Sequence, residues 1–163
     1  MLKGNTKTKK IMAIAFGEIL TVGMLTGCGT STKAKNPTTT EVIENIKNST
    51  EFADMQEGSE EKLEKFVGVK SEDIEEISFY IPKTNLQADE VAVIKVKDEA
   101  KVEDMKKQIE AKVNENGEGF KDYLPEQYNL VENKVLKSER TYILLAVSKD
   151  AEKIEEAFDG SLK

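Results

Sequence analysis

Two short apolar runs constrain the fold of this chain more than any other feature. Val91 to Val96 is almost entirely apolar and β-branched, which is typical of a central strand that is covered on at least part of both faces. Tyr142 to Val147 is a second such run and predicts the last strand of the chain. The fold is therefore expected to be built around a sheet.

Two further strands are predicted beside these runs. Alternating residues from Ile77 to Ile81 indicate a half-buried strand that Pro82 ends. Another strand is predicted near Asn133 to Leu136, and a turn from Lys137 to Arg140 would join it to the last strand as an antiparallel hairpin. The strands thus form two sequence-adjacent pairs.

Helical spacing predicts four helices around these strands. The clearest runs from Ala100 to about Asn114 and is expected to end at the turn from Asn116 to Gly119. Capping signals predict the other three, beginning near Thr38, Ser59 and Asp150. This order predicts an α+β fold: an antiparallel sheet of about four strands with helices packed mainly on one face.

The N-terminal segment has the organisation of a secretory signal peptide. Met1 to Lys10 is polar and basic, Ile11 to Met24 is mostly apolar, and small residues follow. An apolar run of about 14 residues is too short to cross a ~30 Å hydrocarbon core comfortably. The alternative is an uncleaved membrane anchor, against which the carboxylate of Glu18 inside the apolar run argues.

The end of this segment, Leu25, Thr26, Gly27 and Cys28, resembles the lipobox of bacterial lipoproteins. In that motif the cysteine thiol is joined to diacylglycerol and the chain is cleaved immediately before it. The resemblance implies that residues 1–27 are removed and that lipidated Cys28 holds the chain at the extracytoplasmic face of the cell membrane. Residues 28–40 are then predicted to be a flexible tether, and residues 41–163 a single domain.

Composition restricts the classes of function. The net charge is −7, and removal of the basic leader leaves a more acidic chain, which argues against nucleic acid as a partner. The chain contains no histidine, and its single cysteine would carry the lipid, so a catalytic triad or a Cys–His pair cannot be assembled. No cluster with metal-ligand spacing is found, so neither a metal nor a cofactor is expected.

The segment that follows the long helix contains the candidate partner-binding residues. Tyr123, Gln127, Tyr128 and Asn133 are concentrated there, in a chain that is poor in aromatic residues. Tyrosines in loops often anchor protein partners, because the ring is buried while the hydroxyl stays in water. The alternative is that Phe120 and Tyr123 close the open end of the sheet as core residues.

The region from Phe66 to Phe158 resembles a family of bacterial lipoproteins, domain of unknown function 4358. The likeness rests on apolar and aromatic motifs: Ile77 to Tyr80, Glu90 to Lys95, Phe120 with Tyr123, Pro125 to Gln127, and Thr141 to Ser148. The chain departs from the expected pattern at the hairpin turn, where Ser138, Glu139 and Arg140 stand in place of Asn or Gly. The resemblance implies the same fold and membrane address and transfers no activity.

These observations lead to two expectations for function. The first is a membrane-anchored, non-enzymatic binding or adaptor module of the cell envelope, with a protein of the envelope as its partner. The alternative is a carboxylate-dependent cell-wall hydrolase, which requires two acidic side chains that converge in a concave pocket and have raised pKa values.

Overall fold

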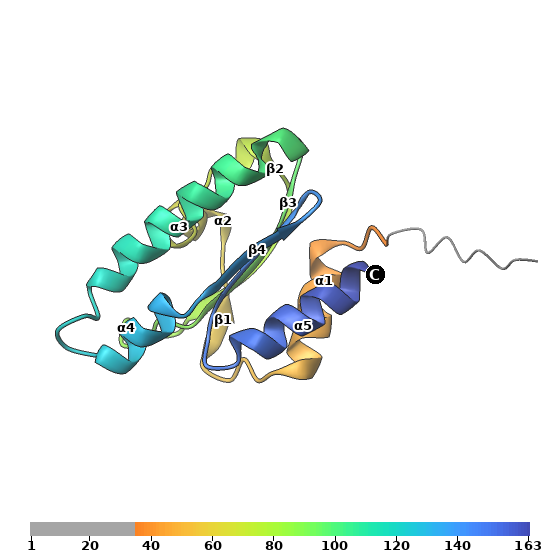
Figure 1. The fold of residues 1–163 in the computed structure, drawn as a ribbon. Coiled ribbons are helices and arrows are strands. Elements are labelled where there is room, and N and C mark those ends of the chain that lie inside the picture. The colour runs from red at the N-terminus through yellow and green to blue at the C-terminus, as the bar shows by residue number, and fades with distance from the viewer. Residues whose placement is uncertain (1–34) are drawn as a thin grey trace, which may run out of the picture. The chain divides into compact units, whose positions relative to one another are not determined.

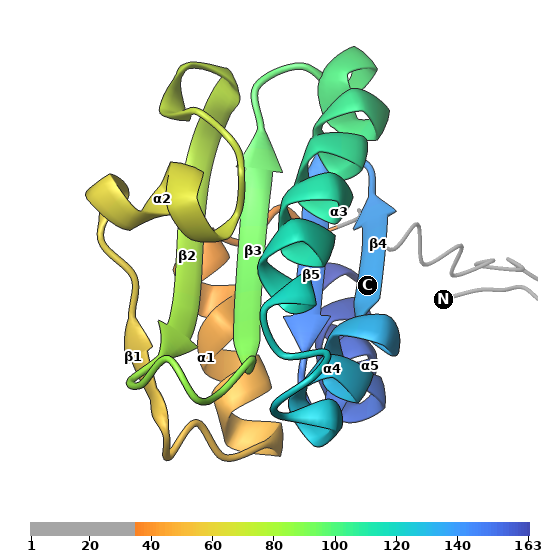
Figure 2. The same ribbon diagram turned by 90° about the vertical axis from the view of Figure 1, so that its left-hand side faces the viewer.

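The two apolar runs form the centre of a five-stranded antiparallel sheet in the computed structural model, which describes residues 35–163. β3 (Glu90–Val96) and β5 (Tyr142–Val147) are buried along their whole length and pair with each other. β2 (Ile74–Pro82) and β4 (Val135–Glu139) flank them, and the short β1 (Met55–Glu57) forms one edge. The strand order is β1-β2-β3-β5-β4 (Figure 2).

Helices cover both faces of this sheet (Figure 1). α1 (Thr39–Ser49) and α5 (Ala151–Leu162) lie on one face. α2 (Glu60–Phe66), α3 (Val102–Glu118) and α4 (Pro125–Glu132) lie on the other, and short 3₁₀ turns precede β2 and α3.

Alternation along β3 explains the two helical layers. Val91 and Val93 pack in the cluster that α1 and α5 cover, whereas Ala92 and Ile94 pack in the cluster that α2 and α3 cover. Successive side chains of a strand point to opposite faces, so a strand that is apolar at consecutive positions needs cover on both sides.

The predicted α+β class and antiparallel sheet are confirmed, with two corrections. The sheet has five strands and not four, because β1 is three residues long with one buried side chain and shows no alternation in the sequence. The helices also cover both faces rather than mainly one. The second correction follows from the full burial of β3 and β5, which one helical layer cannot provide.

The region around α3 and α4 also differs from the prediction. α3 continues through Asn116 and ends at Glu118, because Gly117 packs closely against Val131 of α4 and does not form a turn. α4 was not predicted: it has eight residues, which is too short for a clear helical period, and begins with Pro125 in its first turn.

The hairpin between β4 and β5 forms despite the unusual turn residues. Glu139 pairs with Tyr142, so the connection has two residues, and Arg140 adopts a positive φ of 55°. The left-handed region usually favours Gly or Asn, so Arg140 in this conformation leaves only a weak turn signal in the sequence.

The folded domain begins before the predicted boundary at residue 41. Thr38 caps α1 in a reciprocal capping box with Glu41. The hydroxyl of buried Tyr142 lies 2.8 Å from the side-chain oxygen of Asn36 and 2.5 Å from the carbonyl oxygen of Pro37, both acceptors. Residues 36–40 therefore belong to the domain and not to the tether, because their polar groups are bound to it.

The predicted leader, the lipobox residues Leu25, Thr26 and Gly27, and Cys28 lie outside the described residues. Within residues 35–163, none of the helices is both long and apolar enough to cross a bilayer.

Candidate functional site

The four predicted partner-binding residues have different environments. Gln127 and Asn133 are used within the domain: Gln127 Oε1 accepts the backbone N–H of Ala88 at 2.8 Å, and Asn133 Nδ2 donates to the Asn129 carbonyl at 2.8 Å. The ring of half-buried Tyr128 lies 5.4 Å from the ammonium of Lys121. Tyr123 and Asn133 are both exposed, and the Tyr123 side chain is 86% exposed. The structure therefore does not assemble the four into one surface.

Phe120, in contrast, is a core residue. Its ring packs against the apolar cluster beneath α3, as the alternative interpretation of this segment predicted for it. That alternative is wrong for Tyr123, whose ring projects into solvent.

A cavity of about 410 Å³ lies close to this segment, at the end of the sheet where β3 begins. Its walls come from α2, the β2–β3 loop, the last turns of α3, and α4. The Gln127 hydrogen bond fixes Ala88 of the β2–β3 loop, which is one of the lining residues. This volume is in the range of small-molecule sites, which is about 300 to 1,000 Å³.

Asn116 holds two of these walls together. Its side-chain Nδ2 lies 3.2 Å from the carbonyl oxygens of both Lys65 and Phe66, at the end of α2. Carbonyls at a helix C-terminus have no partner within the helix, so this amide satisfies them and fixes α2 against α3.

Glu90 is the most unusual residue of the cavity lining. It is the first residue of β3 and, by alternation with Ala92 and Ile94, faces the layer formed by α2, α3 and α4. The residue is 5% exposed, and Oε1 has no hydrogen-bond partner among the described residues. Burial raises the pKa of the Glu90 carboxyl from 4.5 to about 8, because the charged form loses its hydration.

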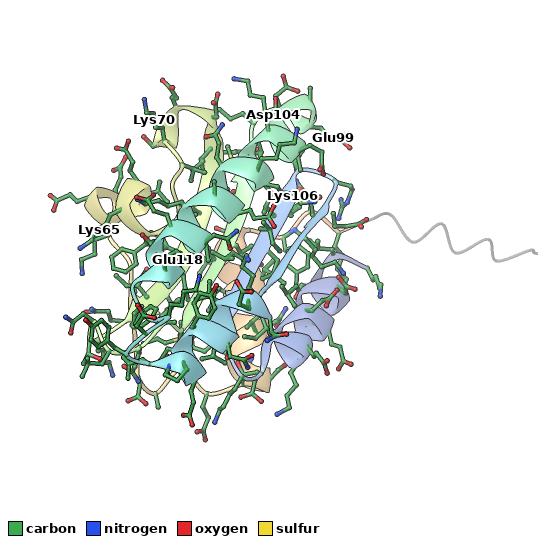
Figure 3. The ribbon with its side chains drawn as sticks, turned by 60° about the vertical axis from the view of Figure 1, so that its left-hand side comes forward. Lys65, Lys70, Glu99, Asp104, Lys106 and Glu118 are labelled. Atoms are coloured by element: carbon green, nitrogen blue, oxygen red, sulfur yellow. The ribbon has the colours of Figure 1, made fainter. Side chains whose placement is uncertain are left out.

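The rest of the lining combines an apolar wall with three lysines. The apolar side chains are Phe66, Ile81, Ala88, Val113, Phe120 and Val131. The lysines are Lys62 and Lys65 on α2 and Lys83 in the β2–β3 loop; Figure 3 shows Lys65 on α2, on the side of the domain that α2 and α3 form.

None of these three lysines forms a salt bridge within residues 35–163, where other lysines pair with acidic residues. Lys83 Nζ donates to the Ala53 carbonyl at 2.7 Å, and Lys65 Nζ lies 5.4 Å from the centre of the Phe66 ring. The cavity therefore has uncompensated positive charge in a chain whose net charge is −7.

The acidic residues of the lining bear on the hydrolase alternative. The hydrolase alternative requires two carboxyl groups, and Glu90 is the single acidic residue in the lining. The neighbouring Asp89 lines a different hollow, together with Ser148 and Lys149. Among the described residues no group of three or more acidic side chains is arranged to hold a metal ion.

Sequence reasoning did not identify the Glu90 cavity. Glu90 is the first residue of the motif from Glu90 to Lys95, and its charge directly before the apolar run is a signal that could have singled it out. Lys62 and Lys65 alternate with glutamates on α2, a pattern that is typical of a solvated helix face.

Comparison with known proteins identifies the family of the chain. The profile of the family described as Domain of unknown function (DUF4358) matches residues 48–148, which is more than half of the chain and includes every residue that lines the cavity. No curated protein and no solved structure matches the chain significantly. The sequence resemblance to this family is thus confirmed, and the chain belongs to the DUF4358 family.

Proposed function

We propose that this chain is a membrane-anchored extracytoplasmic lipoprotein, and that its domain is a non-enzymatic binding module of the cell envelope with the Glu90 cavity as its binding site. The observation that carries the proposal is the buried carboxyl group of Glu90, which lines a cavity of about 410 Å³ without a hydrogen-bond partner for Oε1. A buried polar group without a partner costs free energy in the unliganded protein. A ligand that supplies the partner recovers that energy on binding.

The position of the cavity suits attachment through Cys28. The chain enters the domain at Asn36 and Pro37, beside Tyr142 at the start of β5. Glu90 pairs with Val147 at the other end of the same strand, about 17 Å away at the usual rise per residue. A lipid on Cys28 would thus hold the domain by the end opposite to the cavity and leave the cavity accessible from the outside.

The lipid anchor is tested by labelling cells that produce the full chain with a fatty acid carrying an alkyne group. The wild-type chain is expected to carry the label and to fractionate with membranes, whereas Cys28→Ala is expected to lose the label, because the thiol is the attachment point. A mass spectrum of the wild-type chain with an intact leader and an unmodified cysteine would contradict the assignment.

The binding role is tested by small-molecule capture. The full chain in lipid nanodiscs is incubated with a bacterial small-molecule extract, and retained compounds are identified by mass spectrometry. At least one compound is expected to be enriched over empty nanodiscs and to be lost in Asn85→Trp, because residue 85 lies exposed in the lining and an indole there would cover the cavity.

Glu44→Trp is the matched control, since Glu44 is exposed on α1, which covers the opposite face of the sheet. The control is expected to retain the compound. Equal retention by Asn85→Trp, or no compound enriched on the wild-type chain, would show that the cavity is not a binding site.

A further inference from the structure

We infer that the cavity selects small amphiphilic anions: molecules with a carboxylate near the three lysines, an apolar body against the cavity wall, and an amide group that reaches Glu90. This inference rests on the proposed function, because it names the class of ligand for the same site.

The charge of the ligand follows from the lysines. Lys62, Lys65 and Lys83 come from two separate segments, α2 and the β2–β3 loop, and all line one cavity; none of them forms a salt bridge in residues 35–163. Positive charges that line a cavity attract anions to it. An anionic group at this rim would be attracted and a cationic group repelled, although the chain as a whole is acidic.

The apolar body of the inferred ligand follows from the apolar side chains that line the cavity. Half-buried Phe66 and Phe120 present aromatic surface to the cavity, and the buried side chains of Ile81, Val113 and Val131 complete its apolar lining. Each of these residues belongs to the hydrophobic cluster under α3 or packs against it. Covering such surface with a hydrocarbon group is favourable, because it removes apolar area from water.

The amide group of the inferred ligand follows from the hydrogen bonds that Glu90 can form. Besides Glu90, the lining contains three side chains that titrate, Lys62 and Lys65 from α2 and Lys83 from the β2–β3 loop; α3 and α4 contribute none. Because burial raises the pKa of Glu90 to about 8, the group is mostly an uncharged carboxylic acid at neutral pH and does not repel an anion. A carboxylic acid donates one hydrogen bond and accepts others, and an amide offers both the acceptor and the donor.

Three compounds with a common N-hexanoyl amide and different end groups separate these contributions. They are N-hexanoylglycine, which is anionic; N-hexanoylglycinamide, which is neutral; and N-(2-aminoethyl)hexanamide, which is cationic. Binding of each to the full chain in lipid nanodiscs is measured at pH 6.5 by isothermal titration calorimetry, with empty nanodiscs as the blank. The anion is expected to bind about tenfold more tightly than the neutral amide, and the cation most weakly.

Two triple variants test whether the lysines cause the preference. Lys62→Gln combined with Lys65→Gln and Lys83→Gln is expected to bring the anion to the affinity of the neutral amide, and to leave the neutral amide unchanged within about twofold. The matched control removes the same charge elsewhere, at exposed positions outside the cavity: Lys97→Gln, Lys107→Gln and Lys153→Gln. It is expected to keep most of the preference for the anion, because exposed charges far from the site are screened by salt.

Different failures have different meanings. If the neutral or cationic compound binds as tightly as the anion, and Asn85→Trp abolishes that binding, the cavity is a binding site but the inferred anion preference is wrong. An equal effect of the two triple variants would also overturn the inference, because the preference would then come from net charge alone. If none of the three compounds binds, both the inferred ligand class and the cavity as their site are contradicted.

Discussion

Glu90→Gln is expected to raise the free energy of unfolding by about 4 kcal/mol at pH 8 and to change it by less than about 1 kcal/mol at pH 4. Glutamine has nearly the shape of the carboxylic acid and cannot ionise. The variant therefore removes the cost of keeping a buried carboxyl group uncharged and leaves the cavity wall in place.

The direction of this stability change follows from the protonation state of Glu90 in the folded and in the unfolded chain. The pKa of Glu90 is raised from 4.5 to about 8 on folding, so below pH 4.5 the side chain is protonated in both the folded and the unfolded chain. Between pH 4.5 and about 8 the unfolded chain releases a proton that the folded chain keeps, and the wild-type protein loses stability as the pH rises. Above pH 8 both forms are ionised and the difference becomes constant.

Urea denaturation of wild type and variant across this pH range, followed by circular dichroism, measures the effect. Glu110→Gln is the control, because Glu110 is exposed on α3 and its replacement makes the same change in net charge. The control is expected to follow the wild-type pH dependence. Parallel curves for Glu90→Gln and wild type would show that Glu90 is solvated in the folded protein, and would remove the main support for a binding cavity.

A residue that lowers stability near neutral pH is informative about function. An apolar residue at position 90 would cost less free energy of folding than Glu90, because the whole of β3 is buried and the cross-strand neighbour of Glu90 is Val147. Departures from local sequence–structure consistency are expected at functional sites. The Glu90 carboxyl is such a departure, in contrast to Lys95, which lies in the same strand but forms a 2.9 Å ion pair with Glu75.

Sequence patterns predicted the two central strands well, because the residues that specify each strand are neighbours in the sequence. The bounds predicted for β5 agree with the structure, and β3 begins only one residue earlier than predicted, because full burial selects β-branched and aliphatic side chains at consecutive positions. The capping box at Thr38 and Glu41 was equally local and is confirmed. β1 and α4 were missed because three and eight residues are too few for a periodic signal.

The candidate site depends on contacts between distant segments, which no local pattern contains. Asn116 looked like part of a turn, but it lies on α3 and holds the end of α2. Lys62 and Lys65 become part of a cavity only because α2 docks there. The spacing of charges on α2 is the same whether its lysines face open solvent or a ligand, so sequence alone could not distinguish these cases.

Phe158→Ala is expected to lower the free energy of unfolding by about 3 to 5 kcal/mol, the largest single loss we anticipate. Phe158 is 0% exposed and packs in the cluster that α1, α5 and one face of the sheet form, with Ile43, Ile46 and Leu144 among its members. Removing the ring leaves a cavity between two helices and the sheet, which the rigid strands cannot fill. Urea denaturation measures the loss.

Tyr123→Ala is the matched control, because it also removes an aromatic ring but from a side chain that is 86% exposed. It is expected to change the free energy of unfolding by less than about 0.5 kcal/mol.

The stability of Phe158→Ala also bears on the extent of the domain. α5 and most of α1 lie outside residues 48–148, the segment that matches the DUF4358 profile. A loss below about 1 kcal/mol in Phe158→Ala would mean that these helices are dispensable. The expected larger loss would show that the packing of α5 and α1 on this face of β3 and β5 contributes to the stability of the domain.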